Sequence, residues 1–151
     1  MKSLPMGDTE YRGLAHIAGQ LEFFKTFKGP HLERVLSDVE LHAYDKGETI
    51  FHKGGPPTAF YMIFQGRVRI HLGYRLMGLM KKMAHLGPGD LFGEIALVEK
   101  RMHSGTAVAE VPTQLFVISY ENFDMMMNED PEFANLMKFV VARRKPQPIS
   151  K

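Results

Sequence analysis

The chain has 151 residues, with 19 lysines and arginines, 17 aspartates and glutamates, seven histidines and no cysteine. This length allows one domain, and a composition of 44% hydrophobic and 24% charged residues is typical of a chain that folds around an apolar core. The lack of cysteine excludes disulfides, thiolate catalysis and cysteine-ligated metals, and no stretch is apolar over the roughly 18 residues that a membrane span requires.

The first residues contain no apolar segment of the kind found in signal peptides, so a cytoplasmic location is expected. A formal charge of +2 is too small to indicate a nucleic-acid partner by itself. One basic cluster, Arg143 to Lys145, lies near the end of the chain and is typical of a solvated helix terminus.

Residues 1–22 are predicted to form an N-terminal helical extension. Beginning at Leu14, apolar side chains recur at spacings of three and four, which places them on one helix face: Leu14, Ile17, Ala18, Leu21 and Phe24. Gly29 and Pro30 are expected to end this helix, and a second short helix is predicted from His31 to Leu36.

Short apolar runs separated by turn residues follow, a pattern typical of antiparallel strands. In segment 67–72, apolar and polar residues alternate with period two, as in a strand with one face in water. Seven or eight strands are expected in total, and the clearest segments are 39–44, 49–52, 59–64, 67–72, 81–86, 105–109 and 115–118. This number of strands favours an antiparallel barrel or a double-sheet roll.

The end of the chain returns to helix. Ser119 is a good N-cap residue, and Pro131 suits the first position of the next helix. One face of that last helix is apolar, with Phe133, Leu136, Met137 and Val140. Pro146 and Pro148 are expected to end it.

The segment from Leu72 to Met80 links two strands, yet it is apolar and rich in methionine. Two interpretations are open. The segment is either the tip of a long hairpin that folds back on the core, or an exposed and adaptable patch that binds a partner chain.

Segment 89–109, GDLFGEIALVEKRMHSGTAVA, carries the candidate chemistry. Phe92 is an apolar anchor, Gly93 lets the backbone approach a ligand, and Glu94 to Leu97 are expected to form one helical turn. The free N–H groups that open such a turn suit an anion such as phosphate. A carboxylate repels phosphate, so Glu94 either accepts hydrogen bonds from sugar hydroxyls or caps its own helix.

This segment resembles the phosphate-binding cassette of cyclic nucleotide-binding domains. The resemblance is carried by Phe92–Leu97 and His103–Thr106, and it extends from Phe23 to Arg144. Other matching features, at the proper spacing, are Tyr61-Met62-Ile63 with Gly66 and Val68, the Gly87–Asp90 turn, Ile118–Phe123, and Asp130-Pro131 leading to Ala142-Arg143-Arg144.

The resemblance implies an α+β fold, mainly β: an eight-stranded antiparallel β-roll of jelly-roll type, flanked by N-terminal and C-terminal helices. It implies a cyclic nucleotide-binding domain over residues 23–145, followed by a tail at 146–151. The implied function is a regulatory module that is not an enzyme. It would bind cyclic AMP or cyclic GMP and act through its C-terminal helix.

The resemblance also implies which residues bind the ligand: Phe92, Gly93, Glu94, Ile95, Ala96, His103, Ser104 and Gly105. Glu94 would accept a hydrogen bond from the ribose 2′-hydroxyl. His103 stands where the family has the arginine that pairs with the cyclic phosphate. A histidine offers at most two donors, and it is charged only below a pKa of about 6.5.

Three further positions bear on this departure. Ser104 keeps a hydroxyl that would reach a phosphate oxygen or a guanine edge, and Gly105 replaces the family's usual alanine. Arg101, two residues before His103, would substitute for the missing arginine if a strand has already begun there.

The lid is a second departure from the family, whose final helix continues over the base. Because Pro146 and Pro148 are expected to end the last helix of this chain, the base of the nucleotide would be covered by Phe139 and Arg144 or by another protomer. The chain also shows no helix-turn-helix, kinase or channel segment, so we expect no direct DNA binding and a sensor without its own effector.

Two functions therefore remain open from the sequence. One is a cyclic nucleotide sensor, and the other is a degenerate domain that binds no nucleotide and serves as an interaction scaffold. A protein partner or a second copy would dock through the C-terminal helix or the loop at 72–80. No metal site and no catalytic residue is expected, because no His-x-His pair occurs and histidines scattered over strands are mostly surface or core residues.

Overall fold

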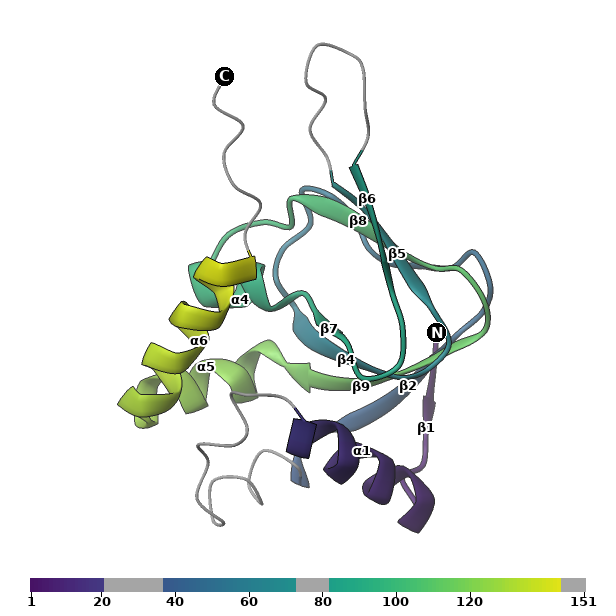
Figure 1. Ribbon diagram of the computed structural model, residues 1–151, viewed down its shortest axis with the longest axis horizontal. Helices are drawn as coiled ribbons and strands as arrows, with labels where there is room; N and C mark the ends of the chain where they lie inside the picture. Colours follow the sequence, from purple (N-terminus) through teal and green to yellow (C-terminus); the bar gives the residue numbers. More distant parts are fainter. Residues whose placement is uncertain (21–36, 73–81, 145–151) are drawn as a thin grey trace.

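The computed structural model describes residues 1–20, 37–72 and 82–144. Within them the chain forms two antiparallel sheets and four helices (Figure 1). The strands are β1 (Lys2–Leu4), β2 (Glu40–Tyr44), β3 (Thr49–Phe51), β4 (Ala59–Gln65), β5 (Val68–Leu72), β6 (Lys82–Leu86), β7 (Leu91–Phe92), β8 (Gly105–Ala109) and β9 (Thr113–Ser119). The helices are α1 (Asp8–Gln20), α4 (Glu94–Glu99), α5 (Tyr120–Glu129) and α6 (Pro131–Arg144).

One sheet has the strand order β1-β2-β9-β4-β7, and the other has the order β3-β8-β5-β6. The two sheets wrap into a roll, and α4, α5 and α6 gather on one side of it while α1 lies at one end (Figure 1). This arrangement confirms the predicted class, a mainly β roll with flanking helices.

The five-stranded sheet has an apolar core on each face, because successive side chains of a strand point to opposite sides. On β4, Phe60 and Met62 face the helices, whereas Tyr61 and Ile63 face the interior of the roll. This explains why β4 is buried along most of its length rather than showing the alternating polar pattern of β5.

The C-terminal helices begin where the sequence predicts. The Ser119 hydroxyl accepts a hydrogen bond from the Asn122 N–H at 3.3 Å and caps α5. The Asp130 carboxylate accepts from the N–H groups of Glu132 and Phe133, at 3.0 and 3.1 Å, and caps α6 ahead of Pro131. Such caps satisfy backbone donors that have no partner inside the helix.

Two strands were not predicted. β1 lies in the segment predicted as an N-terminal helical extension, and it pairs with β2 so that Lys2 lies opposite Ala43. The two-residue strand β7 pairs with β4 and places Phe92 opposite Tyr61. With these additions the described residues form nine strands, against the seven or eight expected from turn signals and the eight implied by the resemblance.

Several sequence predictions lie outside the described residues: the ends of the first helix face at Leu21 and Phe24, the helix at 31–36, the apolar loop beyond Leu72, and the prolines after α6. The described part of the first helix does bury its predicted face, with Leu14, Ile17 and Ala18 in the core beneath the five-stranded sheet.

Candidate functional site

The cassette begins at the end of β7. Phe92 is buried at the end of this strand, and Gly93 follows with a positive φ of 86° as the N-cap of α4. A Cβ at Gly93 would lie 3.2 Å from the Tyr61 ring and 3.3 Å from the Ala59 carbonyl oxygen. Both the backbone conformation and the lack of space therefore require glycine here.

Helix α4 carries the next three predicted site residues. Glu94 opens the helix with only 2% of its surface exposed, and Ala96, two residues later, is also buried. Ile95 lies between them in the helix backbone, and its side chain is outside the described part. The helix packs against both β4 and α6, so its position links the roll to the last helix (Figure 1).

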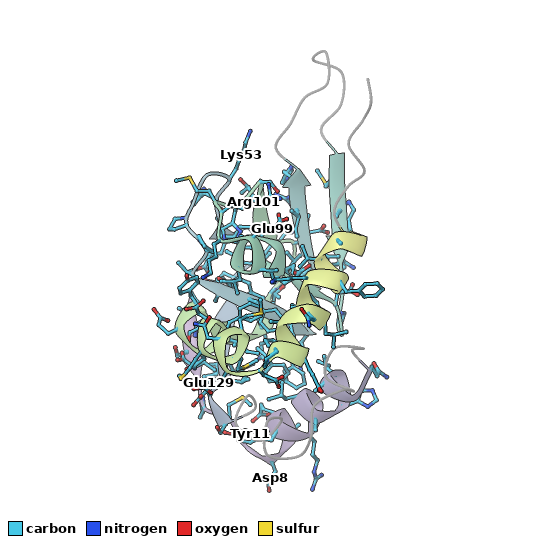
Figure 2. All side chains as sticks on the ribbon, turned by 90° about the vertical axis from the view of Figure 1, so that its left-hand side faces the viewer. Asp8, Tyr11, Lys53, Glu99, Arg101 and Glu129 are labelled. Atoms are coloured by element: carbon cyan, nitrogen blue, oxygen red, sulfur yellow. The ribbon has the colours of Figure 1, made fainter. Side chains whose placement is uncertain are left out.

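The far end of α4 is closed by local contacts. Lys100 adopts a left-handed conformation (φ 52°), and its N–H donates to the Ala96 carbonyl. The Arg101 guanidinium lies 2.9 Å from the Glu99 carboxylate, and this pair lies toward the same end of the molecule as Lys53 (Figure 2). Arg101 thus has an ion-pair partner on α4 in this structure.

His103 lies between α4 and β8 and is 5% exposed. Its backbone is held on both sides: its N–H donates to the Gly55 carbonyl at 2.9 Å, and its own carbonyl accepts from the Gly54 N–H at 2.8 Å. No hydrogen-bond partner of its ring nitrogen Nε2 is found among the described residues. Burial lowers the pKa of the His103 imidazole from its ordinary value of 6.5, which favours the neutral ring.

The imidazole stacks on an aromatic cluster formed by Phe51, Tyr61 and Phe92. The rings of His103 and Phe51 are nearly parallel, with centroids 3.7 Å apart and an angle of 8°. The Phe51 centroid in turn lies 6.0 Å from that of Tyr61 and 5.9 Å from that of Phe92. The cluster therefore connects the two ends of the cassette, Phe92 before Gly93 and His103 before β8.

Ser104 and Gly105 follow His103. Ser104 is exposed, whereas Gly105 is buried as the first residue of β8. A Cβ at Gly105 would overlap the carbonyl oxygen of His71 on β5. The close approach of β5 and β8 thus leaves no room for a side chain at this position.

The family model of the cyclic nucleotide-binding domain matches residues 41–130, which is more than half of the chain. The chain belongs to the cyclic nucleotide-binding domain family. This family is a regulatory, ligand-binding domain rather than a catalytic one.

Among curated proteins, the chain is 33% identical over 116 residues to the cyclic AMP receptor protein of Thermus thermophilus, covering 75% of this chain and 52% of that protein. The crystal structure of the Thermus thermophilus catabolite activator protein matches with a TM-score of 0.69 and 29% identity, over 82% of this chain and 58% of that one. The cAMP-bound PfPKA-R structure shares the fold, with a TM-score of 0.74 and 22% identity, over 85% of this chain and 46% of that one. The chain thus spans about half the length of these relatives.

The predicted lid residues of this cyclic nucleotide-binding domain lie on α6. Phe139 is 56% exposed, and the side chain of Arg144, the last residue of α6, is outside the described part. Their role over a base stays a prediction.

Sequence reasoning missed Phe51 and the turn of Gly54 and Gly55 as parts of the site. The sequence indicated only a strand and a turn there, because both features act on a residue about fifty positions away. The single usable signal was the double glycine, since closely approaching backbones often require residues without a side chain.

In the described part of the domain, no group of three or more histidine, aspartate or glutamate side chains is placed to hold a metal ion. None of the helices in that part is both long and apolar enough to cross a membrane.

Proposed function

We propose that this chain is a sensor module that binds a cyclic mononucleotide, cyclic AMP or cyclic GMP, in the cassette formed by Gly93, Glu94, Ile95, Ala96 and His103. One observation carries the proposal. The buried polar or charged side chains of the described residues are Glu94, His103 and Thr113. The Thr113 hydroxyl is used structurally, since it donates to the carbonyls of Arg67 and Val111. The other two flank the cassette helix.

Burying an imidazole is costly unless its polar atoms gain partners, and the His103 Nε2 has none among the described residues, so a bound ligand would supply one. In the proposed complex Glu94 accepts a hydrogen bond from the ribose 2′-hydroxyl, and the Nε2–H of His103 donates to the cyclic phosphate. Phe92 and Gly105 shape the site, and Ser104 supplies a further hydroxyl at its edge.

The proposed output runs through α6. Ligand contacts on α4 bias the packing between α4 and α6, which are in contact, and differential affinity for two arrangements is what makes a ligand a regulator. Phe139 and Arg144 on α6 would cover the base. The module acts in the cytoplasm, without catalysis or direct DNA binding, on a protein partner or a second copy that docks on α6 or the loop at 72–80.

The test is isothermal titration calorimetry of the chain with cyclic AMP and cyclic GMP, with the open-chain 5′-monophosphates as matched control ligands. We expect one-site binding of a cyclic nucleotide that is lost in Glu94→Gln, because the amide is a weaker hydrogen-bond acceptor than the carboxylate. Glu121→Gln, an exposed carboxylate on α5, is the control variant and should bind like the wild type. The proposal would be overturned if neither cyclic AMP nor cyclic GMP bound at millimolar concentration.

A second candidate function is a scaffold that keeps the fold and binds no nucleotide. It is favoured by one observation: the position of the family's arginine holds an imidazole whose burial favours the neutral form. Thermal unfolding separates the two functions. A ligand at a hundred times its dissociation constant adds about 2.7 kcal/mol to the free energy of unfolding, whereas a scaffold shows no shift.

A further inference from the structure

The stacking of Phe51 on His103 restricts the ring that the proposed function assigns to the phosphate. A histidine side chain has two rotatable bonds, and the second of them sets the direction in which Nε2 points. The two hydrogen bonds to Gly54 and Gly55 fix the backbone of His103 but leave this rotation free. The parallel ring of Phe51, 3.7 Å away, restricts this rotation to the plane of the stack, since turning the imidazole out of that plane would drive its edge into the phenyl face.

Phe51 is itself held in place. Its ring contacts Tyr61 and Phe92, which stack on each other with centroids 5.0 Å apart and an angle of 16°. Tyr61 and Phe92 face each other across β4 and β7, so the support comes from the sheet and not from a mobile side chain. The Phe51 ring is therefore packed between His103 and the side chains of two paired strands.

We propose that Phe51 is the positioning residue of the phosphate contact: it holds the His103 imidazole in the one plane from which Nε2 donates to the ligand. This inference rests on the proposed function. It adds a residue of β3, far from the cassette in the sequence, to the determinants of nucleotide affinity. Phe51 itself touches no ligand in this scheme.

The energy available from such positioning is modest. An aromatic stack contributes about 0.5–1.5 kcal/mol beyond the burial of its area, so its loss is expected to weaken binding roughly two- to tenfold. If Phe51 had a purely structural role, its replacement would lower the free energy of unfolding. Any effect on nucleotide affinity would then be the same whichever residue stands at position 103.

A double-mutant cycle distinguishes the two roles. Affinity for the cyclic nucleotide that the wild-type chain binds more tightly, cyclic AMP or cyclic GMP, is measured for Phe51→Leu, His103→Ala and the double variant. We expect Phe51→Leu to weaken binding roughly two- to tenfold in the wild-type background and to have no further effect in His103→Ala. Phe51→Tyr keeps the aromatic face and should bind like the wild type.

Phe64→Leu is the matched control, because it removes another half-buried ring, one that packs on Phe116 in the other core. It should lower stability without changing affinity. The proposal is overturned if Phe51→Leu binds like the wild type, or if it weakens binding equally with and without His103. A wild-type chain that binds neither nucleotide overturns the proposed function as well, so the two failures are distinguishable.

Discussion

His103 lies face to face on Phe51, with ring centroids 3.7 Å apart, and the stack places this histidine inside the aromatic cluster of the roll. An arginine at the same position would carry a permanent charge into the site, whereas the buried imidazole is favoured in its neutral form. The replacement therefore makes the charge of the proposed phosphate contact depend on pH.

The first prediction concerns affinity and pH. In the free protein burial holds the pKa of His103 below 6.5, and a bound phosphate anion raises that pKa because it favours the imidazolium. Binding therefore takes up a proton between the two pKa values, and affinity rises as pH falls through that window, by at most about tenfold per pH unit. Calorimetry at about pH 6 and about pH 8 measures the change.

Other groups near the cassette sharpen this test. The buried Glu94 carboxylate and the Arg101–Glu99 ion pair lie on or next to α4, so their charges also act on the site. In His103→Gln, which keeps a neutral donor, the pH dependence should disappear while some binding remains. A dependence that persists in this variant would assign the proton to another group.

The second prediction concerns stability and pH. Because the pKa of His103 is lower in the folded state than in the unfolded state, the unfolded chain binds a proton at a higher pH than the folded chain does. The free energy of unfolding therefore falls as pH drops below about 6.5, and it stops falling once pH is below the folded-state pKa. Above about 6.5 both states are neutral, and His103 has no effect. The free energy of unfolding, measured with urea, should therefore depend on pH differently in the wild type and in His103→Phe only between the folded-state pKa of His103 and about pH 6.5. Equal pH slopes in the wild type and in His103→Phe would assign the acidic loss of stability to other groups.

The roll itself could be predicted from local patterns. The alternation of residues 68–72 identifies β5, and Ser119 and Pro131 mark the starts of α5 and α6. β1 and β7 could not be found in this way, because two or three residues are too short to show a period. Both exist only because a longer strand, β2 or β4, offers an unpaired edge.

The candidate site also contains residues that a local pattern can identify and one residue, Phe51, that it cannot. Gly93 to Ala96 are consecutive and His103 follows seven residues after Ala96, so the resemblance to the family is enough to name them as predicted site residues. Phe51 could not be named in this way, because its contact with His103 depends on how β3 and the turn at Gly54 and Gly55 meet the start of β8. This contact depends on the pairing of β3 with β8, two strands far apart in the sequence, so no local pattern predicts it.

The third prediction restores the family's charge. His103→Arg supplies a permanent cation with a planar set of donors, and a charge-assisted contact of this kind is worth about 1.5–3 kcal/mol. We expect a roughly ten- to hundredfold gain in affinity for the cyclic nucleotide, and an affinity that no longer changes between about pH 6 and about pH 8. His103→Lys, which adds a charge without the planar fork, should gain less. No gain in either variant would mean that position 103 does not face the phosphate.

The fourth prediction concerns Gly93, whose backbone conformation starts the cassette helix. Gly93→Ala places a side chain at φ 86° and brings its Cβ within 3.3 Å of both the Tyr61 ring and the Ala59 carbonyl. Gly89→Ala is the matched control, because Gly89 has a similar φ of 90° but open space around it. The left-handed conformation alone costs about 1–2 kcal/mol in either variant, and the crowding at Gly93 adds about 1–3 kcal/mol. Urea unfolding should show Gly93→Ala to be clearly the less stable of the two. Equal losses would show that the cassette relaxes around the added methyl group, and nucleotide affinity would then be the more sensitive measure of the displaced Glu94.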